Sequence, residues 1–101
     1  MSLRAPGIGK EQGSILDPLH FEILGEKAAS LGRAGRAVEA RIAELEAFEG
    51  RPEERLALVA RAADAVYAYF VQRELCGLRR HDAVIREYRI PHEVLARLGA
   101  R

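Results

Sequence analysis

The chain has 101 residues, of which 49% are apolar and 31% are charged, and its 16 Lys+Arg against 15 Asp+Glu leave a formal net charge of +1. These values are ordinary for a single globular domain. The balance of charge disfavours a dedicated nucleic-acid-binding protein, which carries a clear basic excess, and it also disfavours an acidic disordered chain.

Cysteine usage and hydropathy indicate the expected compartment. The single cysteine, Cys76, cannot form an internal disulfide, so we expect the reducing cytoplasm. No apolar run approaches the roughly 18 residues needed to span a bilayer, and the segment 1–13 lacks the apolar core of a secretory signal. We therefore expect no membrane association.

The first residues differ in composition from the rest of the chain. Glycine and proline are frequent in the segment 1–14, and apolar side chains are few there. Such a composition is typical of a flexible terminal segment. We therefore predict an N-terminal arm over residues 1–16 and a single helical domain over residues 17–101.

A long helix is predicted from about residue 17 to about residue 48. Asp17 can accept the free N–H groups of a first helical turn, and Pro18 suits the first helical position because it has no N–H. Apolar or small residues then recur in steps of three and four, which indicates a heptad stripe on one face of a helix. The stripe consists of Phe21, Leu24, Ala28, Leu31, Gly35, Val38, Ile42 and Leu45.

Three glycines interrupt this helix, at Gly25, Gly32 and Gly35. Each costs about 1 kcal/mol relative to alanine in a helix interior, so each calls for a compensating reason. Because Gly35 lies on the stripe itself, we interpret the region from Ala28 to Gly35 as a place where another helix backbone crosses closely. The alternative interpretation is a local weak point or kink.

A second helix is predicted from about residue 52 to about residue 76, ending at Gly77. Gly50 suits the left-handed cap after the first helix, and Pro52 suits the start of a new one. The second helix is apolar on most of its circumference, which is typical of a helix buried by several neighbours. Its three apolar rows are Leu56, Val59, Ala63, Val66 and Phe70; Leu58, Ala62, Ala65, Tyr69 and Cys76; and Tyr67, Val71 and Leu75.

The remaining chain predicts two short helices and no strand. Asp82 is a candidate cap for one, Pro91 is a candidate first residue for the other, and Gly99 is its expected stop. The fold class is therefore all-α: a long antiparallel helical hairpin plus two short C-terminal helices. One hairpin cannot cover a helix that is apolar nearly all round, so we expect a homodimer that forms a four-helix bundle. The expected interface residues are Leu24, Ala28, Leu31, Gly35, Val38, Val59, Val66 and Phe70.

No constellation of catalytic or metal-ligating residues has the required spacing, so we expect no cofactor and no metal. A cysteine on the apolar flank of a buried helix is interpreted as a core residue. The polar residues that a ligand or enzyme site between the helices would use are Glu22, Glu26, Arg73, Glu74 and His81. If Arg73 is buried, it needs a carboxylate partner, and Glu22 and Glu26 are the candidates.

A second alternative is a weak nucleic-acid-binding module formed by the basic residues of the tail. The contact residues would be Arg79, Arg80, Arg86 and Arg89, within a coarse helix-turn-helix outline. The structural interpretation of the same residues is a solvated arginine face that bonds the last carbonyls of the second helix. We favour the structural interpretation, because each tail helix has only about two turns and acidic residues lie among the arginines.

Several segments resemble a known family. They are FEILGEKAASLGR (21–33), YFVQRELCGL (69–78), HDAVI (81–85) and IPHEVL (90–95). Together they are similar to a family of small, uncharacterised, all-helical alphaproteobacterial proteins, classed as a domain of unknown function. The resemblance covers about residues 17–100 and implies a cytoplasmic bacterial protein of unassigned activity, with no catalytic or binding residue to carry over. Our leading hypothesis is a non-enzymatic, self-associating helical protein that serves as a small scaffold or regulatory partner.

Overall fold

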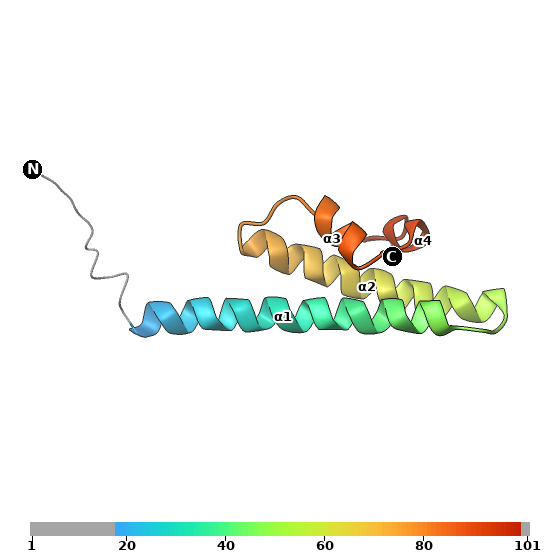
Figure 1. Ribbon diagram of the computed structural model, residues 1–101, viewed down its shortest axis with the longest axis horizontal. Coiled ribbons are helices and arrows are strands. Elements are labelled where there is room, and N and C mark those ends of the chain that lie inside the picture. The colour runs from blue at the N-terminus through green and yellow to red at the C-terminus, as the bar shows by residue number, and fades with distance from the viewer. Residues whose placement is uncertain (1–17, 100–101) are drawn as a thin grey trace, which may run out of the picture. The chain divides into compact units, whose positions relative to one another are not determined.

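The computed structural model describes residues 18–99, which are helical with no strand among them (Figure 1). The elements are α1 (Pro18–Ala47), α2 (Pro52–Leu75), α3 (Asp82–Glu87) and α4 (His92–Leu95). The all-α prediction is confirmed, and both long helices lie within one or two residues of their predicted bounds. The predicted arm and the Asp17 cap lie outside the described residues. The chain divides after Ser30 into two compact units.

The described part of the first unit is the beginning of α1. Every residue from 18 to 29 is exposed, although four of them are large and apolar. Leu19 is 61% exposed, Phe21 53%, Ile23 45% and Leu24 48%. Roughly half of the surface of each of these four side chains is therefore exposed.

In the second unit, the apolar stripe of α1 enters a core. Gly35, Val38, Ile42 and Leu45 are buried there. A guanidinium nitrogen of Arg55 on α2 donates to the carbonyl oxygen of Leu45 at 3.3 Å, which joins the end of α1 to the beginning of α2.

Gly35 has a different neighbour from the one expected. A Cβ at this position would lie 3.0 Å from the Tyr88 hydroxyl oxygen and 3.4 Å from Cε1 of Tyr69. The two tyrosine rings stand edge to face, with centroids 5.7 Å apart. Aromatic side chains, and not a helix backbone, therefore occupy the space that this glycine leaves.

The turn between the long helices corrects the prediction for Gly50. Among the described glycines, Gly77 and Gly99 have a positive φ and Gly50 does not. A Cβ on Gly50 would lie 2.5 Å from Cζ of Phe48 and 2.8 Å from a carboxylate oxygen of Glu54. A larger residue at this position would therefore require the Phe48 or Glu54 side chain to move. The backbone N–H of Arg51 donates to the same Glu54 carboxylate at 3.1 Å, which helps to begin α2.

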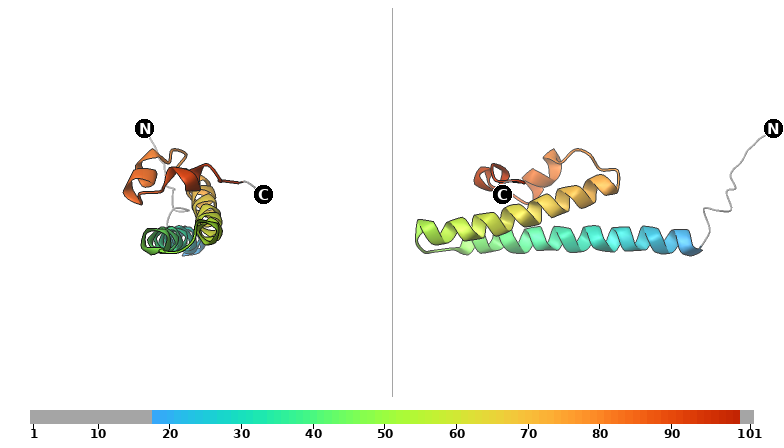
Figure 2. Two further views of the ribbon diagram at one scale, coloured as in Figure 1. Left: turned by 90° about the vertical axis from the view of Figure 1, so that its right-hand side faces the viewer. Right: turned by 180° about the vertical axis from the view of Figure 1, so that it is seen from behind.

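Except for Leu56, which is 59% exposed, the residues of two of the three apolar rows of α2 are buried or half-buried in the chain itself. The buried residues of α2 are Val59, Ala62, Ala63, Val66 and Tyr69. They share a core with Val84, Ile90 and Val94 from the tail, and the second half of α1 supplies the rest of it. Figure 2 shows α3 and α4 lying along α2. The short tail thus covers part of α2, while Tyr67, Val71 and Leu75 of the third row stay exposed.

The tail helices begin one residue away from the predicted cap positions. His81, and not Asp82, is the N-cap of α3, and Pro91 is the N-cap of α4 and not its first residue. Neither N-cap makes a side-chain capping bond. Helices of six and four residues are too short to be stable alone, so packing against α2 holds them.

An ion pair links α4 to α2. Arg55 and Glu93 bond through a guanidinium nitrogen and a carboxylate oxygen. The hydrogen bond raises the pKa of Arg55 and lowers the pKa of Glu93. Because both groups are largely in water, we expect the pair to contribute little to stability.

Candidate functional site at the end of α2

The most polar arrangement of side chains lies where α2 ends and the chain turns into α3. The N–H of Gly77 donates to the Glu74 carbonyl at 3.0 Å, and the N–H of Leu78 donates to the Arg73 carbonyl at 2.9 Å. This pair of bonds is a Schellman motif, and the φ of +88° at Gly77 is the left-handed conformation that the motif requires. The motif reverses the chain and returns His81 to α2.

Arg73 holds this returning segment. Its Nε donates to Nδ1 of His81 at 3.0 Å, and its Nη2 donates to the carbonyl oxygen of Arg80 at 2.7 Å. The guanidinium carbon also lies 5.9 Å from the centre of the Tyr69 ring. One side chain of α2 thus binds two consecutive residues of the loop.

His81 is fixed on both sides of its ring. Its imidazole stacks on the Phe70 ring, with centroids 4.1 Å apart and planes within 4°. Its Nε2 lies 3.0 Å from a carboxylate oxygen of Glu74. Because Nδ1 accepts from Arg73, the proton of the neutral ring belongs on Nε2, where it can be donated to Glu74. Phe70, Arg73, Glu74 and His81 are named here the corner cluster.

The corner cluster is better suited to holding a loop than to chemistry. Both nitrogens of His81 are engaged, so neither is available to deprotonate Cys76 or a substrate. The Cys76 thiol is half-buried. Among residues 18–99, no group of three or more His, Cys, Asp or Glu side chains could hold a metal ion.

The structure brings together three of the five residues proposed for the polar cluster. Arg73, Glu74 and His81 are joined by hydrogen bonds, whereas Glu22 and Glu26 are exposed residues of the first unit. Arg73 is half-buried, and its described partners are an imidazole and a carbonyl oxygen. The expectation of a carboxylate partner applied to a buried Arg73, so it is not tested at this half-buried position.

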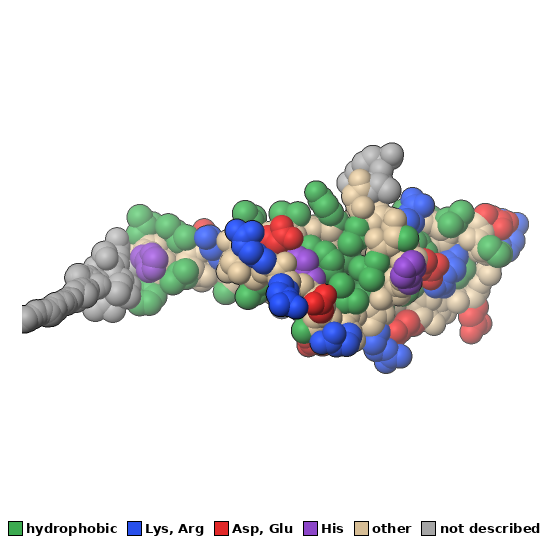
Figure 3. Space-filling model, turned by 90° about the horizontal axis from the view of Figure 1, so that it is seen from above, with side chains coloured by type: hydrophobic (Ala, Val, Ile, Leu, Met, Phe, Trp, Pro, Cys, Tyr) green, Lys and Arg blue, Asp and Glu red, His purple; other side chains and the backbone are tan. Residues whose placement is uncertain are grey.

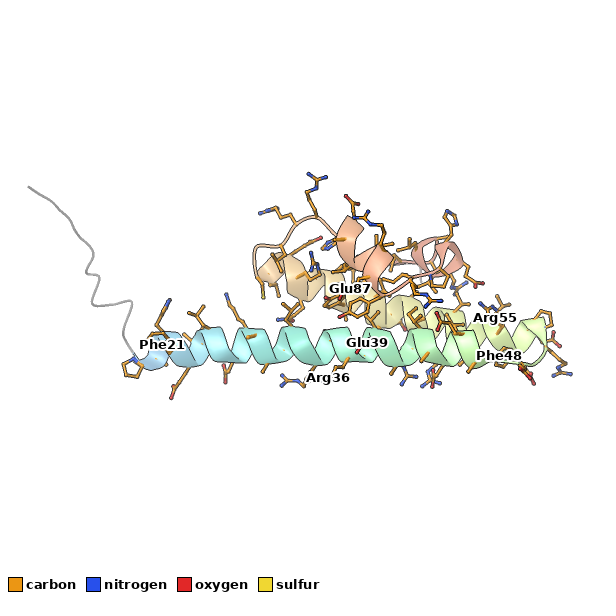
Figure 4. All side chains as sticks on the ribbon, in the orientation of Figure 1. Phe21, Arg36, Glu39, Phe48, Arg55 and Glu87 are labelled. Atoms are coloured by element: carbon orange, nitrogen blue, oxygen red, sulfur yellow. The ribbon has the colours of Figure 1, made fainter. Side chains whose placement is uncertain are left out.

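A second polar region was missed by sequence reasoning. A shallow cleft of about 230 Å³ is lined by Glu39, Ile42, Ala43, Glu46, Glu87, Tyr88 and Arg89. Figure 4 shows Glu39 on α1 and Glu87 at the end of α3 near each other. Burial raises the pKa of Tyr88 to about 12, and the hydrogen bond with Tyr69 and the nearby carboxylates add to the effect. No spacing rule connects these residues, because they come from two distant segments, 39–46 and 87–89.

The arginines proposed for nucleic-acid contact do not form an uninterrupted basic surface. Arg80 lies 3.6 Å from Asp82, and Arg89 lies 3.8 Å from Glu46 within the acidic cleft. Arg79 and Arg86 are exposed. Figure 3 shows acidic and basic side chains interleaved over the tail. Phosphates approaching this region would meet carboxylates as well as guanidiniums, which weakens the attraction.

The residues proposed for a dimer interface fall into two groups. Gly35, Val38, Val59 and Val66 are buried within the chain itself, so they have no surface to offer to a partner. Leu24 and Ala28 are exposed, and Leu31 and Phe70 are half-buried. The first four residues belong to the core that α1, α2 and the tail form together, and the dimer interface itself stays a prediction.

A comparison with protein-family models identifies the family of this chain. Residues 11–101 match the model of a family described as "Family of unknown function (DUF6665)". The chain belongs to this family. No match was found among curated proteins or among solved structures. Within the described residues, no helix is long and apolar enough to cross a membrane.

Proposed function

We propose that this family member is a non-enzymatic helical protein that self-associates, as a homodimer of helical hairpins forming a four-helix bundle. In that role it would serve as a small scaffold or regulatory partner. The resemblance stated above and the lone cysteine favour the cytoplasm of a bacterium, with an alphaproteobacterial origin.

One observation carries the proposal: the first part of α1 has large apolar side chains whose surfaces are 45–61% exposed. An isolated helical segment of this length is marginal in water, and most helices are stabilised by packing of their apolar face. Phe21 and Leu24 lie on the same stripe whose later members form the core. A second copy would cover them and bury apolar area on both sides of the interface.

Sedimentation equilibrium of the full chain at micromolar concentration tests the proposal. We expect a species of twice 11.2 kDa. A single species near 11.2 kDa at these concentrations would contradict it.

A pair of matched variants tests whether the first part of α1 forms the dimer contact. Phe21→Asp combined with Leu24→Asp should shift the protein to monomer, because two charges would replace apolar side chains at the contact. Lys27→Asp introduces the same side chain at a position that already carries a charge, and it should leave association largely intact. Circular dichroism at monomeric concentration checks that residues 31–99 keep their fold.

A further inference from the structure

We draw no further inference here: the strongest candidate, the exposed apolar row of Tyr67, Val71 and Leu75 on the outer side of α2, carries none, because nothing in the structure shows what covers it.

Discussion

The two parts of α1 have the same sequence pattern and different surroundings. From Phe21 to Leu31 the stripe is exposed or half-exposed, whereas from Gly35 to Leu45 it is buried in the core. Helical periodicity is sustained across both parts. The pattern therefore indicates where a helix forms and which side is apolar, but it does not indicate what covers that side.

The largest expected effect comes from comparing one residue in each part. Val38 is fully buried, so Val38→Ala should lower the free energy of unfolding by about 2 kcal/mol through lost burial and a residual cavity. Leu24→Ala should change it little, because Leu24 is 48% exposed. Urea unfolding at monomeric concentration measures both. Equal losses would show that the first part of α1 is packed within the same chain.

Substituting alanine for glycine should have opposite effects on the free energy of unfolding at two positions of α1. Gly35→Ala should lower the free energy of unfolding by about 1–2 kcal/mol. The new Cβ would crowd Tyr88, and this cost should exceed the gain in helix propensity. A Cβ on Gly25 meets nothing within 4 Å, so Gly25→Ala should gain about 1 kcal/mol. Chemical denaturation of the two variants measures both changes in the free energy of unfolding. A gain at both positions would mean that Tyr88 moves away without cost.

Comparing His81 of the corner cluster with the exposed His92 tests how much the cluster contributes to stability. His81→Ala removes an acceptor from Arg73 and the stacked ring from Phe70, so we expect a loss of about 1 kcal/mol. His92 is exposed, and His92→Ala is the control with little expected effect. If His81→Ala melts like the wild type, the loop does not depend on these bonds.

The smallest expected effect is an alkaline loss of stability. The pKa of Tyr88 is raised to about 12, so the folded state favours the neutral phenol. Its contribution is complete below the ordinary tyrosine pKa of about 10 and is lost as the pH rises through about 12. The urea midpoint of wild-type protein should fall between pH 9.5 and about 11.5 by more than that of Tyr88→Phe. If the urea midpoints of the two proteins fall equally with pH, the raised pKa of Tyr88 is contradicted.

The helices could be predicted because their signals are local. Proline at positions 18 and 52 and glycine at position 77 mark helix ends through constraints on φ and on the backbone N–H. The turn at Gly50 was predicted for the wrong reason, since the crowding by Phe48 and Glu54 depends on side-chain placement. The turn after α3 could not be predicted in this way, because the residue with the positive φ of 56° there is Arg89 and not a glycine.

The site was harder to predict because it depends on long-range placement. Arg73, Glu74 and His81 were grouped by charge and position in the chain, but the partner of Arg73 could not be chosen without knowing how far Gly77 reverses the chain. The cover of α2 was underestimated in the same way. Short apolar segments around Val84 and Val94 have weak periodic signals, yet they fill one flank of the helix.

The dependence of the tail on α2 has a consequence for synthesis. Ribosomes deliver the chain from its N-terminus, so both long helices are available before Ile90 and Val94 emerge. Until then the flank of α2 that these residues cover remains open to water and to other nascent chains. We therefore expect a chaperone to have access to this flank in the interval between translation of Leu75 and of Val94.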